Sequence, residues 1–227
     1  DMQEGIQSKS NLRAGKYYHR MLAASVIETE RWGLIEKFPP PQGWKPKTFS
    51  KSGYHFILGF SYAMQGKIEE AKQHLSILNN LREKGFRENY FKRIQNLDLW
   101  ELEIKTAIAL FQKDFEKAIQ FAKKATSIEA KLPSPSGPPR ILKPTYELLG
   151  EVYLKAGKPL RAQKEFSISL SRHSNRIRSL VGMARAAKLN GNKRIAIANY
   201  RKVVKQLKNA NVELPELKEA KKFLKIN

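Results

Sequence analysis

The sequence predicts an all-α fold, an α-solenoid built of stacked helix-turn-helix hairpins. Between residues 141 and 208 one unit is written twice, so that Gly150 corresponds to Ala184 and Gly157 to Gly191, 34 residues apart in each case. A repeat of this length, with small and aromatic residues at fixed places, is typical of stacked helical hairpins. Further pairs with the same separation are Tyr153 and Ala187, Ala162 and Ala196, and Phe166 and Tyr200.

Small residues mark where these helices cross and where they end. The first helix of each hairpin needs a small residue, Gly150 or Ala184, where its neighbour crosses closely. Gly157 and Gly191 are placed to end that helix, because glycine tolerates the left-handed conformation that such ends use. Ala162 lets the second helix pack back against the first.

The N-terminal part of the chain predicts a degenerate first hairpin at 12–38, after a disordered start at 1–10. Apolar residues recur at helical spacing from Leu12 to Thr29, and Trp32 opens a second, brief helix. The prolines at 39–41 stop this helix, because proline cannot continue one.

Four hairpins and a capping helix are predicted after this start. Four prolines between residues 131 and 143 exclude regular structure there and form the longest linker within the repeats. Pro215 begins the last helix, whose charged outer face is typical of the end of a solenoid. The hairpins are expected at about 53–84, 88–130, 144–174 and 175–208, and the capping helix at 215–225. Their helices are expected at about 53–65, 68–84, 88–111, 115–130, 144–156, 159–171, 176–189 and 193–208.

The phasing Leu149-Gly150-x-x-Tyr153, followed by Ala162 and Phe166, resembles the tetratricopeptide repeat family. The whole arrangement, with a Pro-rich insertion before two good repeats, is similar to bacterial tetratricopeptide proteins of unassigned function. The resemblance implies a right-handed solenoid, which we expect to occupy 11–227 as a single domain with one continuous core. It also implies a concave groove, lined by the first helices of successive hairpins, that takes a peptide or a helix of another protein.

Composition excludes several classes of protein. The chain has no cysteine, which excludes disulfides and thiolate chemistry, and no run of about 18 apolar residues predicts a membrane span. It begins with Asp1-Met2, so a processed or trimmed form is expected. The sequence leaves the compartment open between the cytoplasm and export with a signal removed, and it leaves the oligomeric state open too.

Enzyme activity is not expected. The four histidines, His19, His55, His74 and His173, do not have the spacing of a metal-binding helix face. No glycine-rich loop is placed to hold a phosphate, and no nucleophile-elbow motif surrounds a serine. We therefore predict no catalytic residue, no metal site and no cofactor.

Positive charge is the most unusual property of the chain. It has 43 Lys and Arg against 21 Asp and Glu, a net charge of +22. Residues 133–227 carry 21 basic and 6 acidic side chains, and no acid lies between Phe166 and Val212. A field of this sign attracts polyanions or acidic protein surfaces, although lysine-rich composition alone also produces such an excess.

The resemblance places four residues of each first helix at the groove. In the last repeat they are Arg178, Val181, Arg185 and Lys188, of which we expect the three cations to be exposed and to grip carboxylates or phosphates, or else to line a wet trough. Reversing these three charges is expected to leave the fold intact. In the third repeat the groove places hold Glu147 and Glu151, which interrupts the basic track.

Earlier repeats place large apolar residues at the groove instead. Phe56 and Phe60 form a ligand pocket or pack under the loop that contains Trp44, since exposed aromatic side chains are costly unless covered. The same two alternatives hold for Trp100 and Leu110 in the second copy.

Two functions follow from these features, and electrostatic docking on an anionic membrane stays open as a third, although no amphipathic anchor stands out. The first is a non-catalytic adaptor whose groove binds an acidic or mixed acidic-apolar segment of another protein. The second is a basic protein that binds nucleic acid or another polyanion, with affinity that falls steeply with salt. The acid-free stretch holds a single aromatic residue, Tyr200, which is assigned to the core, so stacking platforms for bases are missing. The adaptor is therefore favoured.

Overall fold

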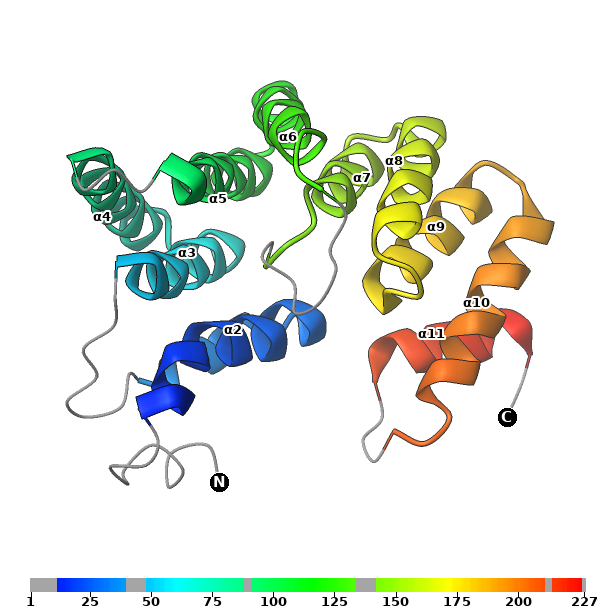
Figure 1. Ribbon diagram of the computed structural model, residues 1–227. Helices are drawn as coiled ribbons and strands as arrows, with labels where there is room; N and C mark the ends of the chain where they lie inside the picture. Colours follow the sequence, from blue (N-terminus) through cyan, green and yellow to red (C-terminus); the bar gives the residue numbers. More distant parts are fainter. Residues whose placement is uncertain (1–11, 40–47, 88–90, 134–141, 211–213, 226–227) are drawn as a thin grey trace. The chain divides into compact units, whose positions relative to one another are not determined.

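The computed structural model describes residues 12–39, 48–87, 91–133, 142–210 and 214–225 (Figure 1). Every regular element in these ranges is a helix, which confirms the all-α prediction for the described residues. The predicted disordered start, Trp44 and most of the Pro-rich linker lie outside them.

The chain divides into two compact units, which we describe one at a time. The first unit comprises 1–129 and 139–142, and the second comprises 130–138 and 143–227. None of the described helices combines the length and the apolar character that a membrane crossing requires.

The first unit packs its helices in pairs that follow the chain. Helix α3 packs against α4, and α5 against α6, while α3 also contacts α5. Both α2 and the short 3-10 helix η2 lie on α3, and η2 is shorter than the brief helix predicted at 32–38. The elements are α2 (Leu12–Thr29), η2 (Trp32–Glu36), α3 (Thr48–Met64), α4 (Ile68–Arg87), α5 (Phe91–Phe111) and α6 (Phe115–Glu129).

The second unit repeats the same arrangement and adds a last helix. Helices α7 and α8 form one hairpin, α9 and α10 form the next, and α9 also contacts α7 and α8. Helix α11 packs on α10 (Figure 1). The elements are α7 (Thr145–Lys155), α8 (Pro159–Arg172), α9 (Ile177–Leu189), α10 (Lys193–Leu207) and α11 (Pro215–Leu224).

The turns of the second unit follow the predicted glycine positions. Gly157 and Gly191 have φ of +68° and +74°, the left-handed conformation expected where α7 and α9 end. Between the hairpins, the Phe166 ring of α8 fills the space beside Gly150 of α7 and Gly182 of α9, where side chains would collide with it. Small residues therefore let α7 and α9 approach the same aromatic ring.

Candidate partner-binding site

The aromatic residues predicted at the groove of the first unit are buried in its core. Phe56 and Phe60 on α3 are 0% and 1% exposed. Phe56 stacks on Trp100 of α5 with ring centroids 5.5 Å apart, and Trp32 of η2 meets Phe60 edge-on at 5.6 Å. Both side chains are thus covered by Trp100 and Trp32, while the loop with Trp44, under which they were expected to pack, lies outside the described residues.

Leu110 is buried as well, at 7% exposure, near the end of α5. The four apolar residues predicted to contact a partner in the first unit are therefore unavailable to one in this structure. The 34-residue period does not reveal which neighbours cover these four side chains.

In the second unit the predicted residues on α9 all face α11. Arg178 forms an ion pair with Glu216. Arg185 binds Glu219 with both ends of its guanidinium: Nε lies 3.0 Å from Oε1, and Nη2 lies 2.6 Å from Oε2. A bidentate pair of this kind fixes orientation as well as distance.

The other two predicted residues complete this contact with an apolar centre and a rim. Val181 is 1% exposed and belongs to a cluster that includes Ala220 of α11. Lys188 is exposed, and its ammonium lies 5.8 Å from the centroid of the Phe223 ring. Its cation therefore rests over the aromatic residue of α11.

The expectation that all three cations are exposed is wrong for Arg178. Its side chain is 4% exposed, because α11 returns onto α9 and places Glu216 opposite it. Reversing its charge would bury a carboxylate against the Glu216 carboxylate, so with Arg178 in this position we expect the reversal to destabilise the second unit.

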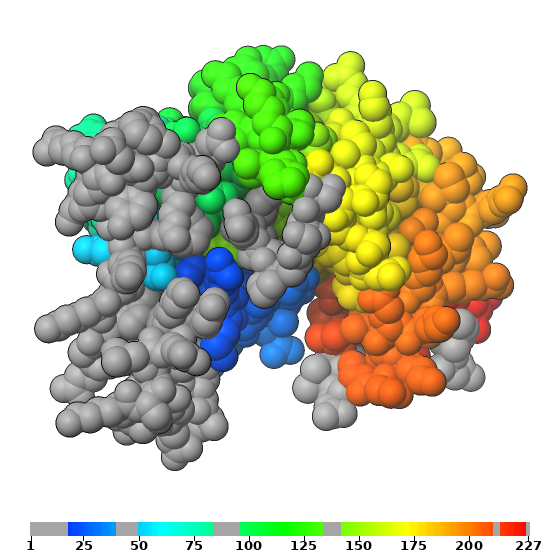
Figure 2. All heavy atoms as spheres, viewed as in Figure 1, coloured from blue at the N-terminus to red at the C-terminus, as the bar shows by residue number. Residues whose placement is uncertain are grey.

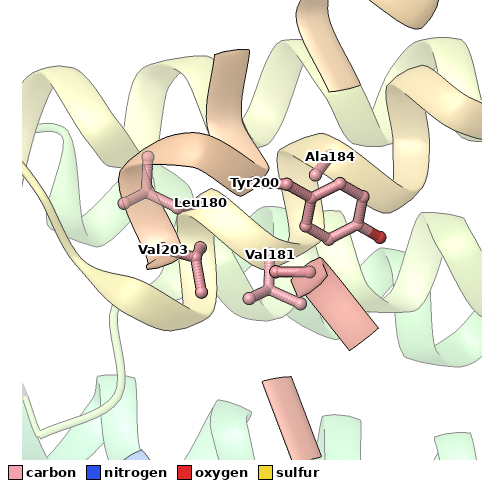
Figure 3. Packing of buried hydrophobic residues seen from close by; sticks show 6 residues of the cluster. Leu180, Val181, Ala184, Tyr200 and Val203 are labelled. Atoms are coloured by element: carbon pink, nitrogen blue, oxygen red, sulfur yellow. The ribbon is translucent and has the colours of Figure 1, made fainter. Parts of the chain in front are cut away.

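An apolar cluster lies beneath these charges and holds α9, α10 and α11 together. Figure 3 shows Leu180, Val181 and Ala184 of α9 beside Tyr200 and Val203 of α10. Each of these five side chains is at most 1% exposed, and Phe223 and Leu224 of α11 pack against the same cluster. The α9 face thus combines a dry apolar centre with cations at its edge.

Tyr200 connects the apolar cluster to the ion pair. Its hydroxyl donates a hydrogen bond of 2.5 Å to Oε1 of Glu219. Burial raises the pKa of Glu219, but the hydrogen bonds from Arg185 and Tyr200 outweigh burial and leave that pKa below its usual value. The Glu219 carboxylate therefore stays ionised at neutral pH, and burial together with this carboxylate raises the pKa of Tyr200.

The cation directly before α9, Arg176, is neutralised by a carboxylate of α7. Arg176 holds Glu147 through Nε at 2.7 Å from Oε2 and Nη2 at 3.1 Å from Oε1. Ser179 donates a hydrogen bond of 2.6 Å to the same carboxylate. Lys143 lies 3.0 Å from Glu147 and 2.7 Å from Glu151, with its own side chain 1% exposed.

This network keeps its charges although it is buried. Burial raises the pKa of Glu147, but Lys143 and Arg176 outweigh burial and hold that pKa well below its usual range. Burial lowers the pKa of Lys143, but Glu147 and Glu151 outweigh it, so that pKa is raised. Glu147 and Glu151, which interrupt the predicted basic track, are therefore the structural partners of cations.

Glu216 and Glu219 were not predicted as the groups that face α9. A signal was present, since Glu151, Arg185 and Glu219 are each 34 residues apart. Extending the period by one more helix places an acid of α11 at the same place as Arg185.

The described residues contain no group of three or more His, Asp or Glu side chains that could hold a metal ion.

No protein-family model matches this sequence, and no curated protein matches it either. The chemistry of the α9 face is that of a carboxylate-binding and helix-binding surface: cations at the edge and apolar side chains at the centre.

Proposed function

We propose that this chain is a non-catalytic scaffold of the tetratricopeptide type, a right-handed solenoid that binds an acidic amphipathic helix of another protein. The observation that carries the proposal is the way α9 holds α11. Two cations grip carboxylates, an apolar centre excludes water, and Lys188 covers an aromatic ring. These are the elements by which a groove recognises one face of a helix.

The spacing of the residues on α11 defines the partner segment. Glu216, Glu219, Ala220 and Phe223 stand at positions i, i+3, i+4 and i+7, which lie on one face of a helix. A partner with acids at the first two positions, a small apolar residue at the third and an aromatic residue at the fourth presents the same groups to α9. We therefore place the mixed acidic-apolar partner on Arg178, Val181, Arg185 and Lys188.

In this proposal the partner competes with α11 for the α9 face. The ion pair between Arg185 and Glu219 can open readily, because the Arg185 side chain is 42% exposed and the Glu219 side chain is 33% exposed. Exposed ion pairs contribute about 0.2–1 kcal/mol, so exchanging one for an equivalent pair with a partner costs little. Arg178 and the apolar centre supply the rest of the affinity, whether α11 or the partner occupies the α9 face.

A labelled peptide with the sequence of residues 214–225 tests the competition. Fluorescence anisotropy would compare the full chain with its Glu219→Lys variant, which loosens α11 while leaving the α9 face unchanged. The variant is expected to bind the peptide at least about tenfold more tightly, a difference of about 1.4 kcal/mol. Adding Arg185→Ala to the variant should abolish that gain.

Glu116→Lys on α6 is the matched control, because Glu116 is exposed and belongs to the first unit. It makes the same change of charge away from α9 and should bind the peptide as the unchanged chain does. The proposal fails if the Glu219→Lys chain binds no peptide while circular dichroism shows its helices intact. It also fails if Arg185→Ala leaves the peptide affinity unchanged.

A further inference from the structure

The outward face of α10 carries a row of cations that the α9 site does not use. Arg194, Arg201, Lys205 and Lys208 are exposed and separated by seven, four and three residues. At 100° per residue these four positions fall within an arc of about 60°, and at 1.5 Å per residue they span about 21 Å. In Figure 2 the orange side chains of α10 form part of the surface that faces the viewer.

The acids of the second unit do not neutralise this row. Glu147 and Glu151 contact Lys143, and Glu216 and Glu219 contact α9. Among the described residues, no acidic side chain forms an ion pair with any of the four cations of the α10 row. These four carboxylates are thus paired with cations outside the α10 row, and the row keeps its positive charge at the surface.

The exposed face of α10 has little that a protein interface needs at its centre. Such interfaces have an apolar core from which charged residues are depleted. The only exposed apolar residue of α10 is Ala198. The exposed residues of this helix are Lys193, Arg194, Ala198, Arg201, Lys202, Lys205 and Gln206.

We propose that the α10 row binds the phosphate backbone of a nucleic-acid duplex, independently of the partner site on α9. Phosphates need only positive charge in register, since release of counterions supplies the free energy. Duplex DNA carries one negative charge per about 1.7 Å of its axis, so a row of about 21 Å meets phosphates along its whole length. A duplex is favoured over a single strand because Tyr200, the aromatic residue of α10, is 1% exposed and offers no base a stacking partner.

Binding of this kind is independent of base sequence and strongly dependent on salt. With about four phosphate contacts, the affinity for DNA should fall about 100-fold between about 50 mM and about 200 mM salt. The interaction positions a duplex against the scaffold without reading it, because phosphate contacts fix position and carry no sequence information.

The test is fluorescence anisotropy of the full chain with a labelled duplex of about 20 base pairs, roughly two helical turns, at both salt concentrations. The double variant Arg201→Glu/Lys205→Glu is expected to lose at least about tenfold in affinity and to show a shallower salt dependence. The neutral variant Arg201→Gln/Lys205→Gln should lose less, in the same direction.

The matched control is Lys123→Glu/Lys124→Glu on α6, which makes the same change in net charge with two exposed lysines of the first unit. It should keep most of the affinity for the duplex. An equal loss in the control would overturn the proposal, since net charge and not the row would then be responsible. Absence of duplex binding at the lower salt concentration would overturn it too.

Two further probes separate the duplex from other anionic surfaces. Vesicles containing about one-fifth phosphatidylserine and a poly-glutamate peptide are measured beside it at the same ionic strength. Binding of either probe in preference to the duplex, with loss in the Arg201→Glu/Lys205→Glu variant, would show that the row serves a membrane or an acidic protein and would overturn the proposal. None of these outcomes depends on the peptide experiment at α9.

Discussion

Arg185 of α9 and Glu219 of α11 meet in a bidentate ion pair, with Nη2 2.6 Å from Oε2 and Nε 3.0 Å from Oε1. Tyr200 of α10 donates to the same carboxylate, so three helices of the second unit meet at one group. The pair joins the last helix of the chain to a residue that the repeat pattern assigns to a partner. Its energetics therefore bear on both stability and binding.

Arg185→Glu should destabilise the second unit, because it places two carboxylates against each other. The swapped variant Arg185→Glu/Glu219→Arg should recover part of the loss. We expect a coupling energy of about 1 kcal/mol, below that of a buried pair, because the Arg185 side chain is 42% exposed and solvent screens it. Urea unfolding of the four members of the cycle measures it, and strictly additive effects would contradict the pairing.

Glu147→Gln should cost much more, on the order of 3–5 kcal/mol, because it removes the carboxylate that the buried Lys143 and the partly buried Arg176 share. The side chains of Glu147 and Lys143 are 0% and 1% exposed. Glu151→Gln is the control and should cost less, since the Glu151 side chain is 22% exposed. Thermal unfolding followed by circular dichroism compares the two, and equal losses would show that the network is not centred on Glu147.

Gly182→Ala should destabilise the second unit by about 1–3 kcal/mol, because a methyl group there overlaps the ring of Phe166. Gly33→Ala in the first unit is the control, where the nearest atom to an added methyl is Gln65 Oε1 at 3.9 Å. Calorimetry would record the melting temperatures. A Gly182→Ala chain that melts as the unchanged chain does would mean that α7, α8 and α9 do not pack as closely as described.

The first unit should lose stability when the pH falls from 7 to 5. His55 and His74 share a contact of 3.0 Å between their Nδ1 atoms, so one ring must donate and the other must accept. Burial, then the neighbouring His74 and Lys51, lowers the pKa of His55 to about 4, and burial lowers that of His74. His19 is buried, and burial followed by Arg20 lowers its pKa to about 4.

The direction of this pH dependence follows from the number of protons that the folded and the unfolded chain bind. Unfolded histidines have a pKa near 6.5, so between pH 6.5 and pH 4 the unfolded chain binds more protons than the folded one. The contribution of the histidines to stability is therefore complete above pH 6.5 and falls below it, by on the order of 1 kcal/mol for each of His19 and His55, and in the same direction for His74. Urea unfolding at pH 7 and pH 5 checks this, and His74→Gln should flatten the dependence. Equal stability of the unchanged chain at both pH values would contradict it.

Local signals in the sequence predict the hairpins of the second unit well. The helices expected at 144–156 and 176–189 are α7 and α9, which run over Thr145–Lys155 and Ile177–Leu189. Gly157 and Gly191 end them in the predicted conformation. Such features follow from apolar spacing and backbone preference within a few residues, which a single sequence contains.

The candidate site was predictable only in part, for a different reason. Repeat phase places Arg178, Val181 and Arg185 on one face of α9, and the structure has them there. The phase of the repeat does not predict which segment packs against this face of α9. Arg178 and Glu216 are 38 residues apart, and the meeting of these two charges depends on the path of the chain between α10 and α11.

The helices, their turns and the small residues at the crossings can thus be predicted from local sequence, because hydrogen bonding and close packing within a hairpin are local. Which charges face solvent depends on contacts between segments that are distant in the sequence. An ion pair forms where two distant segments meet, and burial then selects the carboxylates and cations that satisfy each other. Arg178 and Arg185 form ion pairs with α11 in this way, whereas Arg201 and Lys205 remain exposed on α10.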